Sequence, residues 1–265
     1  MRLLARILMT AALSAIAVQG ARAQSPEPEA CPRLIASGAP RILPAALADN
    51  EIGLRFTGHS TFLIETPSGL RVATDYNDYV RPPLPLDIVT MNKAHDTHFS
   101  YRPPAEIPHV LRGWNPAGGA AAHDLSVKDM RVRNVVTNIR DFAGRTEYDG
   151  NSIFVFESRQ ICIAHLGHLH HELTEEHLKQ LGRIDVVLVP VDGSLTLDVY
   201  GQFENLKKIG APLIIPMHYF NRATLDRFLR LARQLYEVEF SQTASVVLTR
   251  ETLPVRPKVL VLPGQ

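Results

Sequence analysis

Cysteine and net charge are both scarce in this sequence. Only two of its 265 residues are cysteines, Cys31 and Cys162, so at most one disulfide can form within the chain. That pairing stays open, because Cys162 sits in the apolar run 161–164, where a buried free thiol is the ordinary expectation. The sequence has 28 Lys and Arg residues and 27 Asp and Glu residues, so its formal net charge is +1. This balance, without a basic run among aromatic residues, argues against nucleic acid as a partner.

Long apolar runs are missing as well. Beyond the N-terminus, no segment approaches the roughly 20 apolar residues that a membrane-spanning helix needs. At the N-terminus, two arginines flank the start of an apolar run over residues 7–18, and residues 21–23 read Ala-Arg-Ala, a pattern that signal peptidase cleaves. We therefore expect residues 1–23 to be a signal peptide and the mature protein to be periplasmic or secreted, without membrane association. An uncleaved anchor is the alternative.

The remaining chain, about 240 residues, is long enough for one domain with a large core. Residues 24–50 are rich in Pro and Ala and show no clean period, which favours an extended N-terminal arm. Residues 51–265 contain no internal repeat, low-complexity tract or linker. We expect them to form a single domain.

Short β-rich segments fill the first half of this domain, and strands alternate with helices in the second half. Strands are expected over 54–57, 61–65, 70–74, 87–91, 110–112, 131–136, 152–157, 161–165, 184–189, 213–217, 245–248 and 259–262, and helices over 173–181, 200–209 and 223–236. Thr174 suits the N-cap of the first helix, but His177 stands where an acid or amide would complete a capping box. The order of elements predicts two packed sheets covered by helices.

Histidines follow three of the expected strands. In chain order they are His95 and His98, His165 and His168, and His218. In a layered αβ fold, the strand ends on one side gather into a single site. Neutral imidazole is the commonest metal-ligating side chain, so five converging imidazoles indicate a transition-metal site, with zinc as the best fit.

Several segments together resemble the metallo-β-lactamase superfamily, closest to its lactonase-like and phospholipase-like hydrolases. In order and spacing, the matching segments are 58–65, 74–75, 87–90, 163–167 and 215–219. The resemblance runs from about residue 52 to residue 218, most of the mature chain. It implies an α+β fold of four layers, the αββα sandwich, and a metal-dependent hydrolase that acts on a small-molecule substrate.

The metal motif departs from the family's pattern. Where the family has His-x-His-x-Asp-His, residues 93–98 read Lys-Ala-His-Asp-Thr-His. Lys93 therefore replaces a histidine and Thr97 replaces an aspartate. His168 stands where the family has an aspartate that bridges two metals.

The resemblance assigns His95 and His165 to a first metal by position. It assigns His98 and His218 to a second. Two dications about 3.5–4 Å apart repel each other by on the order of 15–20 kcal/mol at an effective dielectric near 20. The family offsets this repulsion with two carboxylates and a hydroxide, and both carboxylates are missing here. One zinc ion is therefore favoured over two, which leaves surplus imidazoles for hydrogen bonding or proton transfer.

Further residues are expected to support the metal ligands: His59, Asp75, Lys93 and Thr97. His59 lies on a turn beside a strand end and is also a candidate for substrate contact, although a turn histidine bonded to the backbone is the alternative. His59 and His168 are the candidates for a catalytic base, with no catalytic residue assigned. We expect Asp192 to be a turn residue, with a place in the lining of the pocket as the alternative. We expect His170 and His171 to lie at the surface.

The leading hypothesis is a periplasmic zinc-dependent hydrolase that activates water at a site rich in histidine and poor in carboxylate. Its substrate would be an ester, a lactone or a phosphodiester. The alternative is a non-catalytic binding protein on the same fold, in which Lys93 takes the place of a metal cation. A serine hydrolase is disfavoured because no Gly-x-Ser-x-Gly motif is present.

Overall fold

The computed structural model describes residues 46–82, 85–141 and 143–264. The expected signal peptide, most of the expected arm and Cys31 lie outside the described residues, and with Cys31 the possible disulfide to Cys162. The described residues all belong to one unit, Pro44–Gln265. Among them, no helix is both long enough and apolar enough to cross a membrane.

Six strands of the described chain form the first sheet, in the order β13-β1-β2-β3-β4-β5. Their bounds are β1 (Ile52–Gly58), β2 (Thr61–Glu65), β3 (Arg71–Ala73), β4 (Ile88–Met91), β5 (His109–Arg112) and β13 (Ser245–Leu248). Neighbouring strands from β13 to β3 are antiparallel, whereas β3, β4 and β5 are parallel. In β1, Ile52, Leu54 and Phe56 are buried at alternate positions, as expected for a strand with one face on the core.

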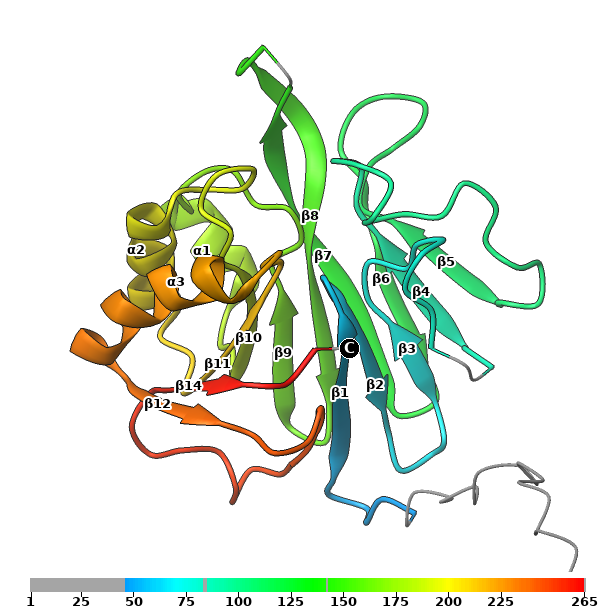
Figure 1. Ribbon diagram of the computed structural model, residues 1–265. Helices are drawn as coiled ribbons and strands as arrows, with labels where there is room; N and C mark the ends of the chain where they lie inside the picture. Colours follow the sequence, from blue (N-terminus) through cyan, green and yellow to red (C-terminus); the bar gives the residue numbers. More distant parts are fainter. Residues whose placement is uncertain (1–45, 83–84, 142, 265) are drawn as a thin grey trace, which may run out of the picture. The chain divides into compact units, whose positions relative to one another are not determined.

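Eight described strands form the second sheet, in the order β12-β14-β11-β10-β9-β8-β7-β6. Their bounds are β6 (Asp124–Val127), β7 (Met130–Arg140), β8 (Thr146–Ser158), β9 (Ile161–His165), β10 (Val186–Pro190), β11 (Leu213–Met217), β12 (Glu237–Phe240) and β14 (Lys258–Val261). From β9 to β12 neighbouring strands are parallel, and from β6 to β9 they are antiparallel. The long hairpin of β7 and β8 projects beyond the neighbouring strands (Figure 1).

The helices pack on one face of the eight-stranded sheet (Figure 1). Their bounds are α1 (Glu175–Leu181), α2 (Val199–Ile209) and α3 (Arg222–Leu235). Phe203 of α2 stacks on Phe228 of α3 with ring centroids 5.0 Å apart. The N-terminus of α1 corrects one expectation, because Thr174 and His177 do form a capping box. The Nδ1 atom of His177 accepts from the main-chain N–H of Thr174 at 3.2 Å, as a carboxylate would.

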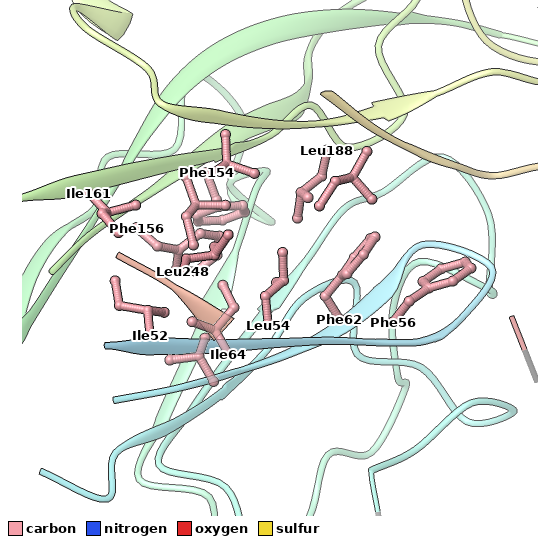
Figure 2. Packing of buried hydrophobic residues seen from close by; sticks show 14 of the residues in the cluster. Ile52, Leu54, Phe56, Phe62, Ile64, Phe154, Phe156, Ile161, Leu188 and Leu248 are labelled. Atoms are coloured by element: carbon pink, nitrogen blue, oxygen red, sulfur yellow. The ribbon is translucent and has the colours of Figure 1, made fainter. Parts of the chain in front are cut away.

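The main core lies between the two sheets. Figure 2 shows Leu54 and Phe62 from the six-stranded sheet facing Phe154, Phe156 and Leu188 from the eight-stranded one. The expected α+β arrangement of two packed sheets is confirmed.

Loops cover the outer face of the six-stranded sheet. Val89 and Met91 of β4 are buried there against Phe99, Ile107 and Trp114, which belong to the segments around β5. The layer outside this sheet is thus built from loop side chains in the described part of the chain, in place of a helix.

Candidate metal centre

The carboxyl ends of the parallel strands β9, β10 and β11 lie at one edge of the eight-stranded sheet, because parallel neighbours end on the same side. His165 is the last residue of β9, Asp192 follows β10, and His218 follows β11. From the six-stranded sheet, the turn between β1 and β2 brings His59, and the loop after β4 brings His95 and His98. Two sheets therefore contribute side chains to one site.

Four imidazoles form the centre of this site. His59, His95, His98 and His218 each place a ring nitrogen within 4.8 Å of the other three. His98 and His218 are fully buried, and in the described residues their Nε2 atoms have no hydrogen-bond partner. A buried polar atom without a partner costs about 1–3 kcal/mol. A metal cation would remove this cost for both nitrogens at once, so the residues present fit a metal cofactor.

A carboxylate stands behind each of the two unpartnered imidazoles. Nδ1 of His98 lies 2.5 Å from Asp75, and Nδ1 of His218 lies 2.9 Å from Asp192. A proton on Nδ1 that donates to the carboxylate leaves the lone pair of Nε2 free to bind a metal, and ligating histidines are commonly oriented this way. Two carboxylates are thus hydrogen-bonded to these imidazoles, although the motif itself lacks carboxylates.

Asp192 combines the expected turn role with the alternative, a place beside the site. It does accept hydrogen bonds from the main-chain N–H groups of Ser194, Leu195 and Thr196, as a turn residue would. It also accepts from His218, which ties this loop to the centre. The available signal was its place directly after β10, the strand between the two that end in histidine.

Burial disfavours the charged form of three of the clustered imidazoles, His59, His95 and His98. It lowers the pKa of His59 to about 4, helped by repulsion from His218, and it also lowers the pKa of His95. The pKa of His98 falls well below its ordinary value for the same reason. Neutral imidazoles have lone pairs to offer, so the site is ready for a cation near pH 7.

The two carboxylates shift in opposite directions. Burial raises the pKa of Asp75, although the nearby imidazole of His165 and the hydrogen bond from Asn92 oppose the rise. Burial would also raise the pKa of Asp192, but hydrogen bonds from His218, Thr196 and Ser194 hold that pKa below its ordinary value. Asp192 is therefore an anion in the folded protein, which favours a nearby cation.

Three residues of the site have left-handed backbone conformations. The φ angles are 51° at His59, 41° at Asp75 and 55° at His218. Non-glycine residues adopt such angles at a cost and are concentrated at functional sites. The main-chain N–H of His218 donates to the carbonyl of His59 at 2.8 Å, so the two strained turns hold each other across the sheets.

His165 lies outside the four-histidine cluster, although the resemblance makes it a metal ligand. It is fully buried, and both of its ring nitrogens have protein partners. Nε2 donates to the carbonyl of Ser60 at 2.8 Å, and Nδ1 accepts from the main-chain N–H of Gly167 at 3.1 Å. In this structure, His165 links the β1–β2 turn to the end of β9.

His168 joins the centre through His95, with their Nε2 atoms 3.1 Å apart. Its Nδ1 atom lies 2.6 Å from Nε2 of His170. The expectation that His170 lies at the surface is wrong, since it is buried with only 7% exposed. The reason is its contact with Arg140, which donates to it from both main chain and side chain. His171 is half-buried.

Lys93 and Thr97, the two departures from the family motif, have different surroundings. The ammonium group of Lys93 pairs with Glu147, and its side chain is 47% exposed. Thr97 is part of the site: its hydroxyl lies 2.9 Å from Nε2 of His59 and 2.7 Å from Nδ1 of His95. The threonine thus connects two of the four clustered imidazoles.

A cavity of about 320 Å³ opens beside the centre. His59 lines it together with Phe56, Tyr219 and Phe220, so the cavity reaches the imidazole cluster. A larger hollow of about 530 Å³, lined by residues 120–124 and parts of β7 and α1, contains none of the four clustered histidines. The smaller cavity is therefore the candidate for substrate binding.

Comparison with known proteins decides the family. The profile of the β-lactamase superfamily domain matches residues 53–218, well over half of the chain. The chain belongs to the metallo-β-lactamase superfamily. Both the layered fold and the position of the histidine cluster at the strand ends agree with this membership.

The individual relatives share only limited sequence identity with this chain. A protein of Thermoplasma acidophilum named as a metal-dependent hydrolase is 33% identical over 123 residues, which are 44% of this chain and 52% of that protein. The match thus spans about half the length of this curated relative. A crystal structure from Thermotoga maritima, of a candidate zinc-dependent hydrolase of the superfamily, covers 81% of this chain and 100% of its own at 27% identity and a TM-score of 0.61. A metallo hydrolase of Ignicoccus hospitalis, 15% identical with a TM-score of 0.53 over 81% of this chain and 97% of its own, shares the fold.

Proposed function

We propose that this protein is a metal-dependent hydrolase that binds one zinc ion through His95, His98 and His218. The observation that carries the proposal is the pair of buried, unpartnered Nε2 atoms of His98 and His218. Each belongs to an imidazole whose other nitrogen bonds a carboxylate. Three histidine ligands with a position left open for substrate are typical of catalytic zinc sites. Relatives named as metal-dependent hydrolases support the reaction class.

The surroundings of two residues favour one ion over two. The first metal of the family would need ligands at positions 93, 95 and 165. Lys93 pairs with Glu147, and both ring nitrogens of His165 bond to the main chain. Only His95 of that set remains, and it lies among the ligands proposed for the single ion.

A bound zinc ion supplies a Lewis acid that polarises a substrate oxygen and lowers the pKa of water to about 7. The protein's own residues bind and orient the reactants. His59 lies between the ligand cluster and the 320 Å³ cavity, and burial keeps its imidazole neutral, so it is placed to contact substrate and to accept a proton. Thr97 holds His59 through its hydroxyl.

The cavity supports a small substrate with an apolar group. Phe56, Tyr219 and Phe220 form much of its lining, and aromatic walls bind apolar surface. An ester, lactone or phosphodiester with a hydrophobic substituent fits both this lining and the proposed chemistry. The signal-peptide pattern of residues 1–23 supports action in the periplasm.

Metal analysis of the mature protein tests the proposal. We expect one zinc per chain, with His98→Ala and His218→Ala each losing zinc and the hydrolysis of a test ester. His109→Ala is the matched control, because His109 lies on β5 outside the cluster, and it should keep both. Folded protein that takes up no zinc at micromolar concentrations would contradict the proposal and favour a non-catalytic binding protein.

A further inference from the structure

Arg140 starts a chain of hydrogen bonds that leads into the metal centre. Its main-chain N–H and its Nε–H point at the same atom, Nδ1 of His170, at 3.0 and 3.2 Å. Neither group of Arg140 can accept a hydrogen bond, since both are donors only. Nδ1 of His170 must therefore accept, and the ring carries its proton on Nε2.

The direction set by Arg140 passes on to the next imidazole. Nε2 of His170 lies 2.6 Å from Nδ1 of His168. Because His170 donates from Nε2, His168 accepts at Nδ1 and cannot carry a proton there. A neutral ring has one proton, so His168 carries it on Nε2, the nitrogen that lies 3.1 Å from Nε2 of His95.

The contrast with the two unpartnered imidazoles decides what His168 can do. Asp75 and Asp192 accept from Nδ1 of His98 and His218, which leaves lone pairs at Nε2. His168 has a donor at its Nδ1, so its Nε2 presents a proton to the centre. An N–H group cannot bind a metal ion.

We infer that His170, oriented by Arg140, is a positioning residue that holds His168 in the Nε2–H tautomer, so that His168 serves the centre as a hydrogen-bond donor and not as a metal ligand. This inference rests on the proposed function for the metal site. In the structure, Nε2 of His95 accepts the hydrogen bond that Nε2–H of His168 donates. When the lone pair of His95 binds the metal, the N–H of His168 is released for a new acceptor, and an oxygen atom of the substrate supplies one.

Two substitutions of His170 separate the effect of the hydrogen-bond direction from the effect of replacing the imidazole ring. In His170→Gln, the amide oxygen can accept from Arg140 and the NH₂ can donate to His168, so the direction is kept. In His170→Glu, the carboxylate accepts from both neighbours, so the proton of His168 moves to Nδ1 and Nε2 gains a free lone pair. Arg140 offsets the added negative charge, and thermal unfolding establishes that both variants fold.

Nitrogen NMR of the metal-free, ¹⁵N-histidine-labelled protein reads the tautomer directly. We expect the Nε2–H form of His168 in the wild type and in His170→Gln, and the Nδ1–H form in His170→Glu. An Nδ1–H form in the wild type would overturn the inference. This measurement needs no metal, so it stands apart from the test of the proposed function.

Zinc titration provides the second measurement. The Glu variant should bind zinc about 10–100-fold more tightly than the wild type, because His168 then adds a ligand, while the Gln variant should match the wild type. His168→Phe should bind zinc within about threefold of the wild type. A loss in His168→Phe as large as that in His98→Ala would make His168 a ligand and overturn the inference.

Discussion

A carboxylate oxygen of Asp75 lies 2.5 Å from Nδ1 of His98, and neither side chain reaches solvent. The amide of Asn92 donates to the other oxygen of Asp75 at 3.1 Å, so the carboxylate is held from two sides. Asp75 follows β3, and His98 follows the paired strand β4. The proton position on His98 is therefore set by a neighbouring strand.

Asp75→Asn should weaken zinc binding by about 10–100-fold. An asparagine amide can donate to Nδ1 of His98, which moves the proton to Nε2 and removes the lone pair from the centre. Competition with a chromophoric chelator measures the affinity. Asp226→Asn, which changes an exposed carboxylate paired with Arg222, should leave it unchanged. Equal affinities for the two variants would show that Asp75 does not orient a ligand.

His165→Ala should destabilise the protein without changing its zinc stoichiometry. The substitution leaves the N–H of Gly167 without its partner, removes one of the two donors to the carbonyl of Ser60, and opens a small cavity, which together cost about 2–5 kcal/mol. Urea unfolding of the metal-free protein measures the loss. A variant of unchanged stability that no longer binds zinc would return His165 to the ligand set.

Lys93→Ala should have little effect on either property. Its ion pair with Glu147 is partly exposed, and such pairs contribute about 0–1 kcal/mol. Glu147→Ala is the matched control for loss of the pair. If Lys93 instead stood in for a metal cation, its removal would create zinc affinity that the wild type lacks, and isothermal titration would detect it.

The metal-free protein should lose stability as pH falls from 7 toward 4. Burial lowers the pKa of His59 and of His170 to about 4, from about 6.5 in an unfolded chain. The unfolded state therefore binds more protons in this range, and stability present above pH 6.5 is lost progressively down to pH 4. Thermal unfolding at constant ionic strength measures the slope. His170→Gln should flatten it, and an identical slope would argue against a buried, neutral His170.

The sequence was sufficient for the strands that carry the centre. Apolar runs identified β4 and β11, and the expectation that strand ends on one side of a layered fold gather placed His98 and His218 in one site. The same expectation placed His165 there, but its ring nitrogens bond to the main chain outside the cluster. The edge strands β6 and β12 were missed because their short sequences, Asp-Leu-Ser-Val and Glu-Val-Glu-Phe, are half polar and largely exposed. The signal peptide stays a prediction.

Hydrogen-bond partners were harder to predict than positions. Nothing near His170 in the sequence shows that Arg140, 30 residues away, would hold it inside. The same holds for Asp192, whose turn chemistry is visible locally but whose bond to His218 depends on the pairing of β10 with β11. Local patterns place a residue at a strand end, whereas the partner comes from the assembled sheet.

The β7–β8 hairpin contacts the surroundings of the metal centre at two places. Arg140 at the end of β7 donates to His170, the first imidazole of the chain. Glu147 in β8 pairs with Lys93, in the loop after β4 that also carries His95 and His98. A displacement of the hairpin would therefore move the partners of His170 and of Lys93 together. The hairpin thus contacts both the imidazole chain and the loop that carries His95 and His98.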